Sequence, residues 1–284
     1  MAFFSVIVPT YNRKFLLKIA VESILSQTFK DYEIIIVDDG SADKTGFLIN
    51  DLIKSNSFAR EKIKYIYQEH KGVSAARNVG VMLAKGEFIC FLDSDDRYRQ
   101  NKLEVTFQYI KRYPNYKIFH TEEIWYRNGQ LLPQKKYHKK PTGYVFSYAV
   151  KMCCISISTV AIKKEIFYLI GKFDENLPAC EDYDFWLRVT SKFKVFLIPQ
   201  YLTIKEGGHP DQLSKKYPAL DKFRIYALKK ILESNELDKT NYKIAFEELK
   251  NKCEIYIKGA LKRNKEEEAK YYQKLIDLLK PKDD

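Results

Sequence analysis

The chain has 284 residues, of which 45% are hydrophobic, enough for one large domain or a domain with an appendage. The formal net charge of +12 predicts attraction to anions such as nucleotides, phosphorylated glycans or an anionic membrane surface. There is no biased tract, no stretch near the roughly 20 apolar residues that cross a bilayer, and no basic segment that opens a signal peptide. These features argue against a disordered or membrane-spanning chain. We expect a cytoplasmic protein, with peripheral contact at the inner face of a membrane.

Strands and helices alternate through the first hundred residues. Short runs rich in Ile, Val, Phe and Tyr predict buried strands at 3–8, 33–37, 63–67 and 87–92. Apolar residues at helical spacing predict a helix that contains 17–25, and two more helices are expected at 45–54 and 73–84. Strand and helix in alternation predict a parallel, doubly wound sheet.

The second half of the chain is less regular. Asn128-Gly129 between two apolar runs predicts a tight hairpin, so antiparallel strands should join the sheet. Further strands are expected at 155–162 and 194–198, and further helices at 164–170 and 181–192. From Ala219 onward the pattern is helical almost throughout. We therefore expect one domain at 1–215 and a helical extension at 216–284.

One segment, 133–144, is strongly basic. It contains no acid and four lysines, which are Lys135, Lys136, Lys139 and Lys140. A solvated loop is the simpler interpretation, and a patch that binds an anionic acceptor is the alternative.

Acidic side chains follow two of the predicted strands. Asp38 and Asp39 come after the second strand, and Asp93, Asp95 and Asp96 come after the fourth. Carboxyl ends of parallel strands meet at one edge of a sheet, where ligands bind, and carboxylates gathered there would repel one another without a cation. Oxygen ligands favour Mg²⁺ or Mn²⁺, which typically keep phosphate oxygens in their shell. The pattern predicts a divalent cation and a diphosphate substrate, with a simple turn and helix cap as the alternative.

The start of the third predicted helix is a second candidate for anion binding. Segment 72–78 combines small residues with Arg77, so backbone amides and a guanidinium could bind phosphate oxygens there. Close packing of the helix on the sheet is the alternative. The chain has no Walker loop, and no Gly-x-Gly-x-x-Gly follows the first strand, which argues against ordinary ATPase and dinucleotide-binding roles.

Five motifs, in order and spacing, resemble those of family 2 glycosyltransferases. They are Val6 to Asn12, Val37 to Ser41, Gly72 to Asn78, Phe91 to Asp96 and Glu181 to Trp186. The resemblance covers residues 1–215. It implies a GT-A fold, which is an α/β, Rossmann-like, mostly parallel sheet with an added antiparallel part, here followed by a C-terminal helical appendage. It also implies inverting transfer of a sugar from a nucleotide-sugar donor of the UDP type.

The same resemblance implies a donor site at the ends of the first two strands. It places Pro9, Thr10 and Tyr11 against the nucleotide, with Tyr11 stacked on the base. It implies that Asp39 accepts a hydrogen bond from the base N3–H, which suits uracil or thymine. Arg77 would contact the base or the diphosphate.

For the metal and the reaction, the resemblance implies a second group of residues. Asp93 and Ser94 would face the ribose and the metal, and Asp95 would ligate Mn²⁺ or Mg²⁺. Asp182 would be the general base, although acids at a helix start are also stabilised by the helix dipole without any function. His209 lies in a glycine-flanked segment and is expected as a ligand of the metal or the diphosphate, with a plain surface histidine as the alternative.

We therefore predict a non-processive glycosyltransferase that acts on a hydroxyl of a glycan or lipid-linked acceptor. The Gln-x-x-Arg-Trp motif of processive members is absent. One alternative is a sugar nucleotidyltransferase, which would normally show a Gly-rich loop with a basic residue after the first strand. The other is a non-catalytic basic binding protein. We do not expect nucleic acid as a partner.

Overall fold

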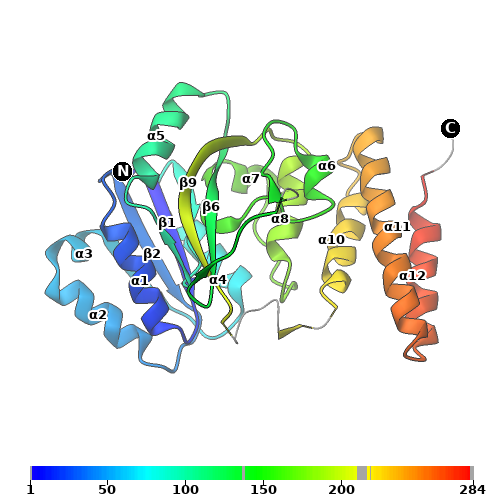
Figure 1. Ribbon diagram of the computed structural model, residues 1–284, viewed down its shortest axis with the longest axis horizontal. Helices are drawn as coiled ribbons and strands as arrows, with labels where there is room; N and C mark the ends of the chain where they lie inside the picture. Colours follow the sequence, from blue (N-terminus) through cyan, green and yellow to red (C-terminus); the bar gives the residue numbers. More distant parts are fainter. Residues whose placement is uncertain (1, 136–137, 210–215, 218, 282–284) are drawn as a thin grey trace.

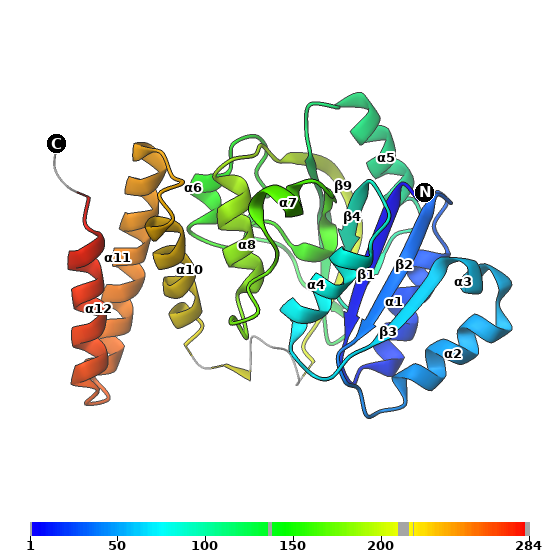
Figure 2. The same ribbon diagram turned by 180° about the vertical axis from the view of Figure 1, so that it is seen from behind.

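The computed structural model describes residues 2–135, 138–209, 216–217 and 219–281. Its centre is one sheet with the strand order β3-β2-β1-β4-β8-β6-β9-β5, and a further strand, β7, pairs with β6. Helices cover both faces of this sheet, and three more helices extend from one end of the molecule (Figures 1 and 2). The predicted α/β architecture with a C-terminal helical part is confirmed.

The amino-terminal half of the sheet is parallel, as the alternation of strands and helices predicts. Its strands are β1 (Phe4–Thr10), β2 (Tyr32–Asp38), β3 (Ile63–Tyr67) and β4 (Phe88–Phe91). The crossovers contain α1 (Lys14–Leu25), α2 (Thr45–Ser55), α3 (Ser57–Lys62) and α4 (Val73–Leu83). β1 pairs in parallel with both β2 and β4, so the carboxyl ends of these strands lie side by side.

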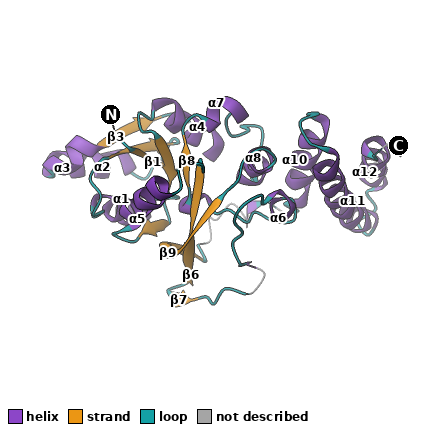
Figure 3. Ribbon diagram, turned by 90° about the horizontal axis from the view of Figure 1, so that it is seen from above, coloured by secondary structure: helices purple, strands orange, loops and turns teal. Residues whose placement is uncertain are grey.

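Alternation along each strand divides the core into two layers, and Figure 3 shows from above the helices on the two sides of the sheet. Val6 and Val8 of β1 pack with α1, α2 and α5 (Lys102–Arg112) on one face of the sheet. Ile7 packs with α4, α7 (Ile166–Ile170) and α8 (Glu181–Thr190) on the other. Parallel strands buried on both faces need such nearly continuous apolar runs, and this explains why they are readable from the sequence.

The second half of the sheet is mixed. It consists of β5 (Asp96–Tyr98), β6 (Ile118–Arg127), β7 (Gln130–Leu131), β8 (Ala161–Lys163) and β9 (Phe196–Gly207). Asn128 and Gly129 both have positive φ, 52° and 75°, and connect β6 to β7. The predicted hairpin is confirmed, because a two-residue loop of this kind requires two residues that tolerate positive φ.

The strand expected at 155–162 is mostly wrong. Only β8 at its end pairs in the sheet, and a 3₁₀ turn, η2 (Ile157–Thr159), precedes it. The Thr159 hydroxyl donates to the Ser156 carbonyl at 2.7 Å, and the Ser158 hydroxyl accepts from the Asp93 amide at 3.1 Å. Hydroxyl side chains that bond to backbone compete with a strand ladder, and here they form a turn beside the end of β4.

The C-terminal helices pack on the rest of the protein as a group. They are α10 (Asp221–Glu233), α11 (Lys239–Leu261) and α12 (Glu266–Leu279). The short helix α6 (Phe146–Ala149) packs against them. Their apolar residues form one core cluster with Tyr183 and Leu187 of α8. The expected domain boundary lies beside 210–215, outside the described residues, and stays a prediction. Within the described ranges, no helix is both long and apolar enough to span a bilayer.

The basic segment 133–144 is not simply solvated. Lys135 and Lys139 are exposed and Lys136 lies outside the described residues, but Lys140 is buried. Its Nζ lies 3.4 Å from Glu123 Oε2 and donates to Thr159 Oγ1 at 3.3 Å. The solvated-loop prediction is therefore wrong for Lys140, because a distant carboxylate compensates the burial of its charge.

Candidate active site

The carboxyl ends of β1, β2 and β4 open into a cavity of about 1660 Å³. The residues of the sequence-predicted site that line it are Pro9, Thr10, Tyr11, Asp39, Arg77, Asp93, Ser94, Asp95 and Asp182. On the β9 side, the described lining includes Gly207 and Gly208 but not His209, so a ligand role for this histidine stays a prediction. Almost the whole predicted site thus comes together in one cavity.

Arg77 connects two acidic motifs beneath this cavity. Its Nη1 donates to Glu181 Oε1 at 2.5 Å and its Nη2 to Asp93 Oδ1 at 2.9 Å, and the side chain is 4% exposed. Burial alone would lower the pKa of Arg77, but the charges of Asp93 and Glu181 raise it above its usual range. The guanidinium therefore stays charged and fixes both acids, and its direct contact with a ligand stays a prediction.

Two of the acids that follow β4 form ion pairs with basic side chains of the protein. Arg13 Nη1 lies 2.8 Å from Asp95 Oδ2, and Lys205 Nζ lies 3.3 Å from Asp96 Oδ2. These ion pairs offset part of the repulsion between the carboxylates, but burial and the charge of Asp93 still raise the pKa of Asp95. The expected metal stays a prediction.

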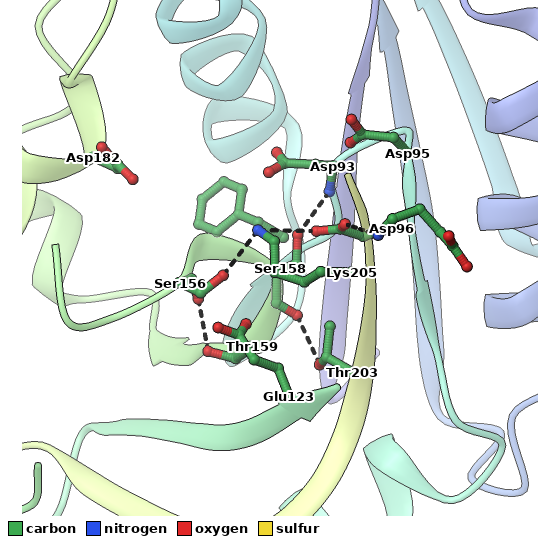
Figure 4. Close-up of polar contacts among 12 residues, drawn as sticks. Asp93, Asp95, Asp96, Glu123, Ser156, Ser158, Thr159, Asp182, Thr203 and Lys205 are labelled. Carbon is green, nitrogen blue, oxygen red and sulfur yellow. Dashed lines mark hydrogen bonds and ion pairs between the residues drawn. The ribbon is translucent and has the colours of Figure 1, made fainter. Parts of the chain in front are cut away.

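Lys205 links three segments at this edge, as Figure 4 shows. It lies opposite Asp96 in the β5–β9 ladder, and its Nζ also donates to Ser156 Oγ at 3.1 Å. Burial raises the pKa of Asp96 to about 7, despite the nearby ammonium. Burial would lower the pKa of Lys205, but Asp96 and Glu123 raise it well above its usual range. Sequence reasoning missed Lys205, since a single lysine in a strand carries no local signal.

The residues after β4 fit a hard divalent cation that is held largely by its substrate. Asp93 and Asp95 both line the cavity with carboxylate oxygens, the ligand type that Mg²⁺ and Mn²⁺ prefer. In the described ranges, no group of three or more His, Cys, Asp or Glu side chains is arranged to bind a metal. Two carboxylates, with diphosphate oxygens and water completing the shell, match the way Mg²⁺ usually binds.

An aromatic ring and a buried carboxylate lie together at the ends of β1 and β2. Tyr11 is 43% exposed, whereas Asp39 is 3% exposed. His70, from the loop after β3, stacks on Tyr11 with ring centroids 4.1 Å apart and contacts Asp39 Oδ2 through Nδ1 at 2.7 Å. The sequence analysis did not single out His70, because no local pattern shows that its loop folds back over β2.

Asp182 lies apart from Asp93 and Asp95, on the α8 side of the cavity (Figure 4). Its Oδ1 accepts the amide of Tyr183 at 2.7 Å, and its Oδ2 accepts the thiol of Cys153 at 3.2 Å. The side chain is half-buried at the first turn of α8, where the helix dipole stabilises a carboxylate. Asp182, and not the Arg77-bound Glu181, is the more accessible acid of this pair.

The C-terminal extension also contributes to the cavity. Leu220 and Arg224 line it, and so do Lys216 and Tyr217 just before α10. Arg224 Nη1 donates to Asp221 Oδ1 at 3.1 Å, which holds the guanidinium near the helix start. The apolar residues of the extension explain its packing on α8, whereas the helical pattern does not predict its place in the cavity wall.

Comparison with known proteins identifies the family. The family model "Glycosyl transferase family 2" matches residues 5–167. The chain belongs to glycosyl transferase family 2. This family 2 chain spans only 31 to 32% of the length of three uncharacterized Rickettsia glycosyltransferases that it resembles at 28 to 33% identity.

Named relatives and solved structures agree with this assignment. The family 2 chain is 33% identical over 202 residues to WfaP of Escherichia coli, a UDP-Glc:alpha-D-GlcNAc-diphosphoundecaprenol beta-1,3-glucosyltransferase. This alignment covers 68% of this chain and 72% of WfaP. S. aureus TarS 1-349 in complex with UDP-GlcNAc aligns with a TM-score of 0.72 and 24% identity over 89% of this chain and 72% of TarS. The mannosyltransferase PcManGT from Pyrobaculum calidifontis, in complex with GDP-Man and Mn2+, aligns with a TM-score of 0.63 and 16% identity over 91% of this chain and 75% of its own. These structures confirm the GT-A type of fold.

Proposed function

We propose that this chain transfers one sugar from a UDP-sugar to a hydroxyl of a lipid-linked glycan, with inversion at the anomeric carbon. The observation that carries the proposal is the single cavity that joins nine of the predicted site residues, with Asp182 on one side and Asp93 and Asp95 on the other. Such a cavity brings a donor site and a general base for the acceptor together.

On the donor side, Tyr11 and Asp39 would hold the base, with Pro9 and Thr10 at the end of β1 beside it. A uracil suits this pair because its N3–H can donate to a carboxylate. The UDP-GlcNAc complex of TarS and the UDP-Glc donor in the name of WfaP support a uridine nucleotide.

The diphosphate would lie beside Asp93, Ser94 and Asp95, where a divalent cation fits. A bound Mn²⁺ or Mg²⁺ would supply positive charge to the departing diphosphate. The complex of PcManGT with Mn2+ supports metal dependence. Arg13 already lies at Asp95, so this chain can hold a cation or its own guanidinium against the same carboxylate oxygen.

Asp182 would act as the general base. Its carboxylate removes the proton of the acceptor hydroxyl, and the acceptor oxygen attacks the anomeric carbon while the bond to the diphosphate breaks. One displacement inverts the configuration. The Cys153 thiol and the Tyr183 amide hold the carboxylate in place, and Glu181 is occupied by Arg77.

The acceptor would be a lipid-linked diphosphate sugar. The name of WfaP includes a diphosphoundecaprenol acceptor, and Arg224 and Lys216 add basic groups to the cavity wall near α10. A lipid-linked acceptor brings the enzyme to a membrane surface, and the net charge of +12 would favour an anionic leaflet. Peripheral binding at the cytoplasmic face follows from this proposal.

The test is a transfer assay with the purified chain. UDP-Glc, UDP-Gal and UDP-GlcNAc are each incubated with Mn²⁺ and with a synthetic GlcNAc-diphospholipid, and UDP release and glycolipid products are measured. We expect metal-dependent release of UDP and a β-linked product from one donor. Formation of a nucleotide sugar and pyrophosphate from UTP and a sugar phosphate would instead support a nucleotidyltransferase. No turnover of any donor, with salt-dependent retention on DNA, would support a binding protein.

A further inference from the structure

A side chain of the protein itself fills the place proposed for the nucleotide base. The His70 imidazole lies on the Tyr11 ring, with centroids 4.1 Å apart and an interplanar angle of 19°. Its Nδ1 lies 2.7 Å from Asp39 Oδ2 and 3.1 Å from the Asp39 carbonyl oxygen. Since both oxygens are acceptors, Nδ1 carries a hydrogen and donates it. A planar ring with an N–H donor thus makes the two contacts that are proposed for uracil.

The acceptor capacity of Asp39 is already filled. Oδ1 accepts from Gln68 Nε2 at 2.7 Å and from the Lys71 amide at 2.9 Å, and Oδ2 accepts from the Gly72 amide at 2.8 Å and from His70. A carboxylate has about four lone-pair sites. A base N–H can therefore bond to Asp39 only if one of these donors leaves.

Gln68 is partly buried, so the most exposed of these four donors is His70. Its side chain is 50% exposed, whereas two of the other donors are backbone amides fixed at the entry to α4. The backbone of His70 packs against Gly40, where a Cβ would come within 2.9 Å of the His70 nitrogen. The loop backbone is thus held closely, while rotation about the side-chain bonds can move the ring away.

We infer that His70 is an internal ligand of the base subsite, which the incoming base must displace. The inference rests on the proposed function and deepens it, because it defines the nucleotide class by its chemistry. The imidazole demonstrates that the subsite accepts a planar ring that donates a ring N–H to Asp39. Uracil and thymine offer such a group at N3, whereas N3 of cytosine is an acceptor and would face the carboxylate unfavourably.

Displacement of an internal ligand lowers the apparent affinity by the fraction of molecules in which the subsite is open. Removing the ring should therefore tighten nucleotide binding. We expect His70→Ala to bind UDP about tenfold more tightly than the wild type, as measured by calorimetry with saturating Mn²⁺. His70→Phe should give an intermediate affinity, since a phenyl ring can still lie on Tyr11 but cannot donate to Asp39.

Two controls make the result specific. Tyr67→Ala removes an exposed aromatic ring at the end of β3, and it should leave UDP affinity unchanged. CDP should bind more weakly than UDP to the wild type and to His70→Ala.

Displacement of the ring can also be observed directly. In ¹⁵N-histidine spectra, the Nδ1–H signal of His70, assigned by its absence in His70→Ala, should shift when UDP is added to the wild type.

The outcomes separate the inference from the function. Weaker UDP binding by His70→Ala would show that the imidazole supports the base, and it would overturn the inference, as would an affinity within twofold of the wild type. If the wild type, His70→Ala and His70→Phe all fail to bind UDP, the proposed UDP-dependent function is overturned, and the inference with it.

Discussion

Nη1 of Arg77 donates to Oε1 of Glu181 at 2.5 Å, although the two residues lie 104 positions apart in the chain. This contact ties the start of α8 to α4, and the second nitrogen of the same guanidinium holds Asp93. This arrangement gives the two neighbouring acids of α8 different environments. Glu181 is buried in an ion pair, and Asp182 is left to face the cavity with a thiol and an amide as its partners.

Arg77→Met should destabilise the protein strongly. It leaves the carboxylates of Glu181 and Asp93 without their cation, and breaking a buried pair typically costs about 3–5 kcal/mol. Urea unfolding followed by circular dichroism measures this change. The double variant Arg77→Met/Glu181→Gln should recover part of the loss, because it removes one uncompensated charge. A loss below about 1 kcal/mol in the single variant would show that the ion pairs are not structural.

The Asp96 carboxyl should make stability depend on pH. Burial raises its pKa from 3.8 to about 7 in the folded protein. The folded state therefore binds the proton more tightly than the unfolded state, and this group lowers stability as pH rises from about 4 to 7. In Lys205→Met the fall should continue to higher pH than in the wild type, because the ammonium no longer lowers the pKa of Asp96. In Asp96→Asn the fall between about pH 4 and 7 should be shallower than in the wild type. Equal slopes in all three proteins, measured by urea unfolding, would contradict the raised pKa.

Asp95→Asn should weaken Mn²⁺-dependent UDP binding, because a neutral amide is a poorer ligand for a hard dication than a carboxylate. Calorimetry with and without Mn²⁺ measures the effect. Asp51→Asn, at an exposed position of α2, is the matched control and should bind as the wild type does. If UDP affinity and its Mn²⁺ dependence are the same in Asp95→Asn, then Asp95 is not a metal ligand.

Arg224→Gln should raise the KM for a diphospholipid acceptor and leave donor affinity unchanged. Losing one charge-assisted hydrogen bond to a phosphate corresponds to a change of about tenfold or more. Lys229→Gln, five residues further along α10, removes the charge of a residue that does not line the cavity, so it serves as the control. A rise in the donor KM without a change in the acceptor KM would place Arg224 in the donor site instead.

Much of the fold could be predicted because its signals are local. β1 to β4 are short apolar runs buried on both faces, and Asn128-Gly129 determines a hairpin through its own backbone preferences. The segment before β8 could not be predicted in the same way. Its hydroxyls bond to backbone groups that include the distant Asp93 amide, and an apolar-rich pattern does not reveal such partners.

The residues that line the cavity could be predicted from strand ends and family motifs, but the hydrogen bonds and ion pairs among them could not. Arg13 and His70 each contact a predicted site residue, and Lys205 contacts the neighbouring Asp96, and in each case the fold brings together residues that are distant in the sequence. Sequence spacing reveals that carboxylates gather at the edge of the sheet, and it does not reveal which cations compensate them. The repulsion that predicts a metal is therefore partly offset by Arg13 and Lys205, which only the fold brings to these acids.

We propose that this cavity transfers sugar with Asp182 as its general base. The most direct test compares wild type with Asp182→Asn, using the donor and acceptor that the transfer assay identifies. Loss of a general base costs roughly 10²- to 10⁴-fold in rate, so turnover should fall by about that much. UDP affinity and melting temperature should stay near wild type, because the donor contacts lie elsewhere in the cavity. Turnover within about threefold of wild type would show that Asp182 is not the general base, since that change is too small for the loss of a base.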